Sequence, residues 1–182
     1  LGQYERAINF YQQSLTVFRE LKDRKEEANV LNNLGMAYKN LGQYERVINF
    51  FQQSLPICRE FKDRKQEADV LSVLGVAYLS LGQYERAINF FQQSLPIYQE
   101  LKDRKEEARV LNNLGVAYYN LGQNKRAINF FQQSLPIKQE LKDRKEEADV
   151  LNILGDAYNH LGQHKTAINF YQQSLPIYQE LK

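Results

Sequence analysis

The chain has 182 residues, with 24 basic and 22 acidic side chains and a formal net charge of only +2. No block of five or six like charges occurs, so the sequence offers no strong electrostatic field for nucleic acid. No apolar run reaches about 18 residues and the first residues do not form a signal peptide, which argues against a membrane partner.

The only cysteine is Cys58. An internal disulfide is therefore impossible, and a reducing compartment is favoured over secretion. We expect a soluble, cytoplasmic protein.

The sequence is a tandem array with a forty-residue period. The string LGQ recurs at 1–3, 41–43, 81–83, 121–123 and 161–163, and INF and QQSL keep the same offset in every copy. The chain lacks an initiator methionine and starts in the middle of a repeat. We therefore expect a fragment of a longer array.

In chain order, each complete unit first predicts an amphipathic helix, which we call A. In residues 23–62, apolar or small residues at positions 28, 30, 31, 34, 35, 37, 38 and 41 share one side of a helix turning about 100° per residue. Asp23 is a predicted N-cap, and Glu26 completes the pattern of a capping box. Gly42 can adopt the left-handed conformation that ends the helix. The later caps are Asp63 with Gln66, Asp103 with Glu106, and Asp143 with Glu146.

A second helix, B, is predicted from about Tyr44 to Phe61, with an apolar stripe at positions 44, 47, 48, 51, 55 and 58. Pro56 falls on the side opposite this stripe and should face water. Two interpretations stay open: a continuous helix with a modest kink, or two helices broken at the proline. Pro96, Pro136 and Pro176 repeat the feature, whereas the first copy carries Thr16.

The strings NNLGMAY, LGQYERVI and FFQQSL resemble the tetratricopeptide repeat. The matching positions are Leu34, Gly35, Tyr38, Gly42, Tyr44, Val47 and Phe51, with Ser54 where the family usually has alanine. The period departs from the 34 residues typical of the family, and the proline that usually ends B is missing. The longer unit is similar to the Pins/LGN type and to arrays in large bacterial, particularly cyanobacterial, proteins.

This resemblance implies an all-α solenoid, a right-handed superhelix of antiparallel helix pairs. Gly35 and its equivalents should let helix B approach A closely, with Tyr38 and Phe51 filling the space between them. We expect an orphan B helix in residues 1–22, followed by repeats at 23–62, 63–102, 103–142 and 143–182.

The resemblance further implies that the A helices line a concave groove that holds a partner peptide. The copies differ most on the non-apolar face of A, as a groove reading a non-repeating ligand would require, although drift on an unconstrained surface would give the same pattern. The candidate peptide-binding residues are Asn29, Asn32, Asn33, Met36, Lys39, Asp69, Ser72, Val73, Val76, Leu79, Arg109, Asn112, Asn113, Val116, Tyr119, Asp149, Asn152, Ile153, Asp156 and His160.

The chemistry of this face is mixed. The asparagine amides can both donate to and accept from a peptide backbone. Arg109 is a candidate partner for a carboxylate, so we expect a ligand with an apolar core and at least one acidic residue. The apolar middle of the face consists of Val73, Val76, Leu79, Val116 and Tyr119.

The carboxylate clamp of the chaperone-binding subfamily is not matched, because its positions hold Asn32, Ser72, Asn112 and Asn152, then Met36, Val76, Val116 and Asp156. Asn33, Asn113 and Arg109 match peptide-contacting positions of the Pins/LGN type. Val73 and Ile153 depart from that pattern, which puts a continuous asparagine ladder in doubt.

Asp156 and His160, with Asp149 two turns earlier, have a spacing that can hold a metal or an acid–base pair. Two ligands on an open helix face are more often an ordinary exposed pair, and His164 reads as solvated. No phosphate-binding glycine loop occurs. We expect no enzyme activity and no cofactor.

The favoured hypothesis is a protein-interaction scaffold within a larger signalling or regulatory protein. One alternative is a structural spacer or self-assembling module, because the uncapped terminal helices could associate end to end. Another is an engineered, consensus-like array, favoured by the similarity of the units and opposed by irregular changes such as Cys58, Asn124 and His164.

Overall fold

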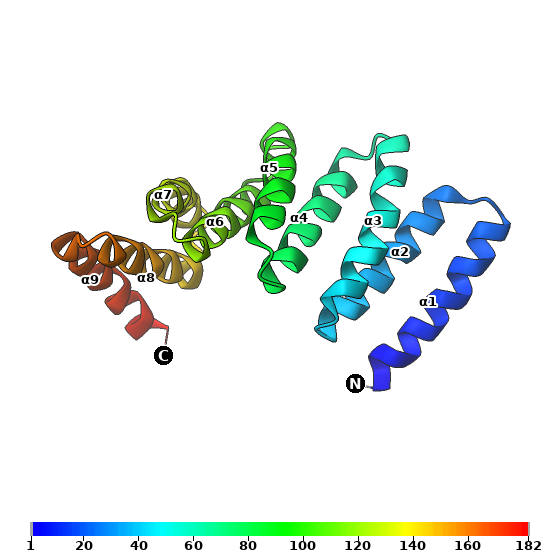
Figure 1. The fold of residues 1–182 in the computed structure, drawn as a ribbon, viewed down its shortest axis with the longest axis horizontal. Coiled ribbons are helices and arrows are strands. Elements are labelled where there is room, and N and C mark those ends of the chain that lie inside the picture. Colours follow the sequence, from blue (N-terminus) through cyan, green and yellow to red (C-terminus); the bar gives the residue numbers. More distant parts are fainter. Residues whose placement is uncertain (1, 182) are drawn as a thin grey trace. The chain divides into compact units, whose positions relative to one another are not determined.

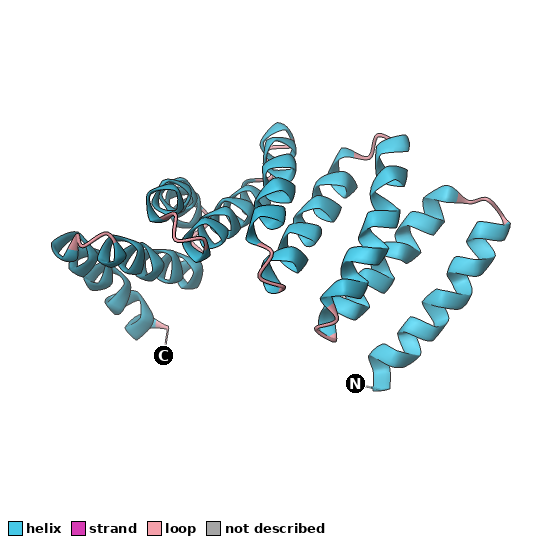
Figure 2. Cartoon of the chain, in the orientation of Figure 1, coloured by secondary structure: helices cyan, strands magenta, loops and turns pink. Residues whose placement is uncertain are grey.

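The computed structural model of the protein describes residues 2–181. Within this range the chain forms nine α-helices and no strand (Figure 2). The predicted A helices are α2, α4, α6 and α8, and the predicted B helices are the odd-numbered ones, so the all-α expectation is confirmed. The bounds are α1 Gly2–Glu20, α2 Arg24–Asn40, α3 Tyr44–Glu60, α4 Arg64–Ser80, α5 Tyr84–Glu100, α6 Arg104–Asn120, α7 Asn124–Glu140, α8 Arg144–His160 and α9 His164–Glu180.

The chain divides into two compact units, residues 1–97 and 98–182. In the first unit α1 packs on α2, α2 on α3 and α3 on α4, as Figure 1 shows in blue to green. In the second unit α6 packs on α7, α7 on α8 and α8 on α9. Three-residue turns join successive helices, so neighbours in each unit run in opposite directions.

The turn from A to B is a Schellman motif built on glycine. Gly42 has φ +69°, its N–H donates to the carbonyl of Lys39 at 2.9 Å, and the N–H of Gln43 donates to the carbonyl of Tyr38 at 3.0 Å. These two bonds satisfy carbonyls that the end of a helix leaves free. The predicted role of Gly42 is confirmed.

The turn from B to A has the same geometry with lysine in place of glycine. Lys62 has φ 55°, its N–H donates to the carbonyl of Arg59 at 3.1 Å, and the N–H of Asp63 donates to the carbonyl of Cys58 at 3.0 Å. Nothing in the sequence pattern predicts this conformation, because a side chain with a Cβ resists positive φ. The same strain recurs at Lys22, Lys102 and Lys142.

The N-caps of the A helices contain one of the two hydrogen bonds that the sequence predicts. The side chain of Asp23 accepts a hydrogen bond from the backbone N–H of Glu26 at 3.1 Å, so the cap itself is confirmed. The reciprocal bond of a capping box is not needed, because the N–H of Asp23 already donates to the carbonyl of Phe18 at 2.9 Å. The capping-box prediction is therefore wrong in this second half, since the Schellman turn uses the same donor.

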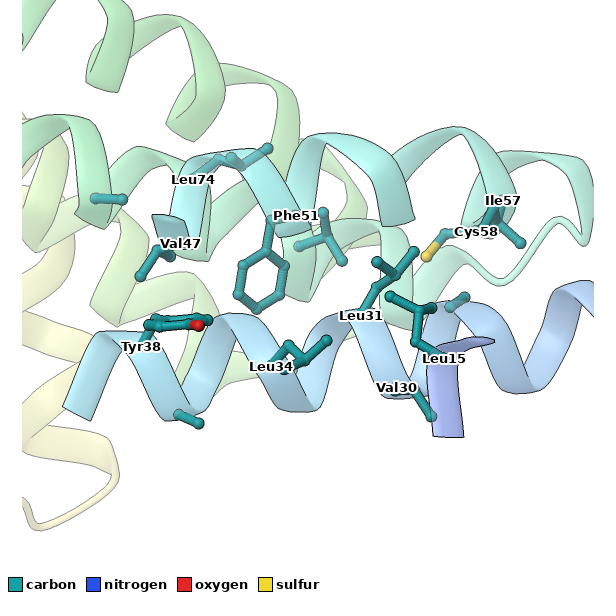
Figure 3. Packing of buried hydrophobic residues seen from close by; sticks show 14 of the residues in the cluster. Leu15, Val30, Leu31, Leu34, Tyr38, Val47, Phe51, Ile57, Cys58 and Leu74 are labelled. Atoms are coloured by element: carbon teal, nitrogen blue, oxygen red, sulfur yellow. The ribbon is translucent and has the colours of Figure 1, made fainter. Parts of the chain in front are cut away.

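The core of each pair is a glycine on A facing an aromatic ring on B. A Cβ built on Gly75 would lie 2.5 Å from Cε1 of Phe91, and Gly35 faces Phe51 in the same way. Figure 3 shows Phe51 reaching from α3 toward α2, close to Leu34. Because a Cβ on either glycine would clash with the ring, the expected close approach of the two helices is confirmed.

A second aromatic contact, which sequence reasoning did not predict, joins the end of each A helix to its B helix. The rings of Tyr38 and Phe50 stack with centroids 5.4 Å apart, and the guanidinium of Arg46 lies 4.9 Å from the Tyr38 centroid. Aromatic and cation–π contacts of this kind each add about 0.5–1.5 kcal/mol. The stack recurs in Tyr78 with Phe90, Tyr118 with Phe130, and Tyr158 with Phe170.

Helix α3 continues through Pro56, whose side chain is exposed as predicted. The alternative of two helices broken at the proline is therefore wrong. An exposed position lets water satisfy the carbonyl that the proline leaves without a donor.

A buried carboxylate joins each B helix to the next A helix. Glu27 lies beneath the surface and accepts from Nε of Arg19 at 2.9 Å and from Nη1 of Arg24 at 2.5 Å. Burial alone would raise the pKa of Glu27, but the hydrogen bonds and charges of the two arginines together lower it. The carboxylate stays ionised and ties α1 to α2.

We expect Gly75→Ala to lower the free energy of unfolding by about 1–2 kcal/mol. Overpacking costs about 1–3 kcal/mol, whereas alanine's better helix propensity returns at most about 1 kcal/mol. Guanidinium unfolding followed by far-UV circular dichroism measures the change. Ser80→Ala, an exposed change on the same helix, is the control; equal stability of the two variants would contradict the packing argument.

We expect Lys62→Gly to raise the free energy of unfolding by about 0.5–1 kcal/mol, because it removes strain of about 1–2 kcal/mol at a modest entropic cost. The reciprocal change, Gly42→Lys, should lower it by a similar amount, since a Cβ at Gly42 meets nothing within 4 Å and only the backbone resists it. The same unfolding measurement applies. A loss of stability in Lys62→Gly would show that the lysine side chain stabilises the turn.

Candidate functional site

The predicted groove residues of the first unit lie on the outward faces of α2 and α4. Asn33 and Met36 are exposed. Ser72 is fully buried at 0% exposure, so its predicted place on a binding surface is wrong. Sequence periodicity places it on the non-apolar face of its helix, but the packing of neighbouring helices decides how much of that face stays exposed. The remaining predicted residues here are half-buried: Asn29, Asn32, Lys39, Asp69, Val73, Val76 and Leu79.

A hollow of about 220 Å³ lies between α2 and α4. Met36 and Val73, both predicted, line it together with Phe51 and Val70, which sequence reasoning assigned only to packing. The Oδ1 atom of Asn32, at the same hollow, is buried and has no hydrogen-bond partner. Gln66 and Asp69 also line the hollow, which thus combines apolar walls with polar groups, one of which lacks a partner.

A chain of hydrogen bonds fixes one rim of this hollow. The Sγ of Cys58 donates to Oε1 of Gln66 at 3.1 Å, and Nε2 of Gln66 donates to Oδ1 of Asn29 at 3.0 Å. Burial raises the pKa of the Cys58 thiol, so the thiol keeps its proton and can donate. The amide of Asn29 is therefore held by its neighbours, and sequence analysis gave no sign of this pairing.

In the second unit, α6 and α8 carry the predicted residues. The guanidinium of Arg109 is paired with the carboxylate of Glu106 one turn earlier. The expected role of Arg109 as a free partner for a ligand carboxylate is not supported by this geometry, because part of its hydrogen-bonding capacity is already used. The other predicted residues here are half-buried or exposed: Asn112, Asn113, Val116, Tyr119, Asp149, Asn152, Ile153, Asp156 and His160.

Two tyrosines of α9 hold two aspartates of α8. The hydroxyl of Tyr171 donates to Oδ1 of Asp156 at 2.8 Å, and the hydroxyl of Tyr178 donates to Oδ1 of Asp149 at 2.7 Å. The pKa of each tyrosine is raised to about 12, first by burial and then by the hydrogen bond to, and the charge of, its aspartate. Both hydroxyls therefore remain donors near neutral pH.

An aromatic pair lies at the ends of α6 and α8. The rings of Tyr119 and His160 stack with centroids 5.2 Å apart and planes 16° apart. Burial, and next the charge of Asp156, raise the pKa of Tyr119. Tyr119, Asp156 and His160, all predicted site residues, are thus brought together in one place.

Within residues 2–181, no helix is long and apolar enough to cross a membrane. The same residues contain no group of three or more His, Cys, Asp or Glu side chains suited to a metal ion. Asp156 accepts from a tyrosine hydroxyl and the His160 ring stacks on Tyr119, so both have structural contacts.

The family model described as tetratricopeptide repeat matches the chain in four overlapping stretches, residues 1–60, 26–100, 66–140 and 106–180. No curated protein matches the sequence. The match of the family model is consistent with the helix pairs and glycine contacts described above.

Solved structures share the fold. BtubC (BKLC) from P. vanneervenii is 24% identical, with 99% of this chain and 75% of that chain covered and a TM-score of 0.89. RapI in its apo form is 21% identical over 98% of this chain and 50% of its own length, with a TM-score of 0.88. A putative kinesin light chain with nearly identical TPR-like repeats from Podosopora anserina is 18% identical over 100% and 90%, with a TM-score of 0.81. At these identities the likeness shows the fold alone.

We expect Asp156→Asn to lower the pKa of Tyr171 from about 12 toward its ordinary value of 10, although burial will retain part of the increase. The reason is that the variant removes a negative charge that opposes tyrosinate. Asp149→Asn is the matched control: it should lower the pKa of Tyr178 and leave Tyr171 unchanged. NMR titration of ring-labelled tyrosine measures both, and a Tyr171 titration unaffected by Asp156→Asn would contradict the assigned hydrogen bond.

Proposed function

Because the chain belongs to the tetratricopeptide repeat family, whose repeats generally mediate protein–protein interaction, we propose that it binds a partner peptide on the outward faces of its A helices. Family members are typically non-catalytic scaffolds, and this proposal gives the chain no reaction to perform. It places repeats at 23–62, 63–102, 103–142 and 143–182, with residues 1–22 as a lone B helix. A role within a larger cytoplasmic signalling or regulatory protein is part of the same proposal.

The observation that carries the proposal is the hollow between α2 and α4. It is open at the surface, lined by Met36, Val73 and Phe51, and holds the unpartnered amide oxygen of Asn32. Apolar walls would bury an aliphatic or aromatic anchor of a peptide, which is where binding energy concentrates. An asparagine amide beside such a pocket suits a peptide backbone.

Variation among the repeats also supports a binding role at positions whose side chains are not hydrogen-bonded to another residue of the chain. Asn29 and Asp149 vary between copies, yet each is matched to a neighbour, Gln66 and Tyr178 respectively. Met36 and Val73 vary as well and line the hollow without such a match. By contrast, the exposed glutamine pair on the outer side of B, at positions 52 and 53, is identical in all five copies.

A second candidate function, self-association, is favoured by apolar surface on the terminal helices. Ile168 and Leu175 of α9 are 52% and 57% exposed, whereas Ile128, the equivalent of Ile168 on α7, is 7% exposed beneath α8. On α1, Phe10 is 68% exposed.

We expect peptides selected from a displayed random library on the intact chain to lose at least about tenfold in affinity when Val73 is changed to Glu, because a charge would replace an apolar wall of the hollow, beside the carboxylate of Asp69. Fluorescence anisotropy with the selected peptides measures the loss. Leu21→Glu is the control, since Leu21 is an exposed apolar residue in the α1–α2 turn.

Unchanged affinity in Val73→Glu, or an equal loss in Leu21→Glu, would contradict the proposed site. Light scattering over a concentration series on the unchanged chain and on Leu175→Glu tests the second candidate. An oligomer that dissociates on Leu175→Glu, without any selected peptide, would favour self-association instead.

A further inference from the structure

We propose that the outward face of α8 in the second unit binds a basic segment, with an arginine against Asp156, Tyr119 and His160 and a second basic side chain against Asp149. This rests on the proposed peptide-binding function and names the chemistry of its partner. It differs from the acidic ligand that the sequence suggested through Arg109.

The first reason is a local imbalance of charge. Asp149 and Asp156 accept from tyrosine hydroxyls, which carry no charge, and no cation lies within ion-pair distance of either carboxylate among residues 2–181. Two basic side chains on neighbouring surfaces are already paired with carboxylates. Arg109 pairs with Glu106, and Lys138 pairs with Glu146 at 3.4 Å.

The second reason is the aromatic pair beside Asp156. Tyr119 is half-exposed and His160 is exposed, and their near-parallel rings present a flat surface. A guanidinium can stack on such a ring while its N–H groups reach a carboxylate. Lysine has no planar group to stack, so arginine suits this position better than lysine.

The spacing of the two carboxylates sets the spacing of the ligand. Asp149 and Asp156 are seven residues apart on α8, which corresponds to about 10.5 Å along the helix. An extended peptide advances about 3.3–3.4 Å per residue, so side chains three residues apart span about 10 Å. The partner motif is therefore two basic residues separated by two others.

Tyr171 acts as a positioning residue for this site. It occupies the place that Phe51, Phe91 and Phe131 hold in the other repeats, with its ring against the glycine of its A helix. Among the four A–B pairs only this ring carries a hydroxyl, since the other tyrosine at this position, Tyr11, belongs to the first B helix. The Tyr171 hydroxyl fixes the carboxylate of Asp156. Tyr171→Phe restores the residue of the other repeats and removes only the hydroxyl.

The test uses two capped eight-residue peptides of alanine and glycine, each with two arginines. One peptide has arginine at positions 3 and 6, and the other at positions 3 and 4. Titration of each into the isotopically labelled intact chain at low ionic strength is followed by NMR. We expect the first peptide to shift the amide signals of Tyr119, Asp149 and Asp156 and to bind about three- to tenfold more tightly.

Variants decide which groups are responsible. Asp156→Asn should weaken the first peptide about three- to tenfold, and Tyr171→Phe about twofold with an unchanged Tm. Glu45→Gln removes one negative charge from the first unit, where Glu45 is exposed, and should leave affinity unchanged. Replacing both arginines by lysine should weaken binding, because stacking on Tyr119 is lost.

Equal affinity for the two spacings, or an equal loss in Glu45→Gln, would overturn the inference by showing non-specific attraction. If library-selected peptides still depend on Val73 while neither arginine peptide perturbs α8, the basic partner is rejected and the proposed function stands. If Val73→Glu also has no effect on selected peptides, the proposed function is rejected separately.

Discussion

The contact between a glycine on each A helix and an aromatic ring on its B helix is the constraint on which the rest of the structure depends. With a Cβ at Gly35 or Gly75 the ring of Phe51 or Phe91 would have to move. The distance between the two helices is therefore set by the thickness of one ring. That distance determines which residues of A remain outside, and so determines the candidate binding surface. In the last repeat, where the ring belongs to Tyr171, the same contact also delivers a hydroxyl to that surface.

The turns have a constant length, which keeps the glycine–aromatic contact at the same place in every forty-residue repeat. Both kinds of turn are three residues long and both are Schellman motifs, although one uses glycine and the other lysine at positive φ. The lysine turns carry a strain that glycine would relieve, yet the next residue is the aspartate that caps the following A helix. Turn and cap thus share one short segment, and the backbone N–H of the capping aspartate donates within the turn. This explains why the capping box is incomplete.

Much of the fold could be predicted because its determinants are local. Apolar periodicity, aspartate caps and the Gly42 turn each act within a few residues, so a single sequence contains them. Positive φ at Lys62 could not be predicted, because lysine gives no signal for it. The burial of Ser72 was missed because it depends on the packing of neighbouring helices, which periodicity does not place. The pairing of Arg109 with Glu106 lies within one helix at a spacing of three residues, so the sequence did contain it, but the charge of Arg109 was considered without that neighbour.

The candidate site shows why variation among repeats is an ambiguous guide to binding. Some variable positions differ because their neighbours differ: Gln66 matches Asn29 in one place and Tyr178 matches Asp149 in another. Such pairs make one repeat junction differ from the next. Without them, nearly identical helices would not specify which helix packs against which. Only variable positions whose differences are not explained by such pairs bear on a ligand. Val73 contributes apolar surface of this kind, and α8 contributes negative charge without a cation.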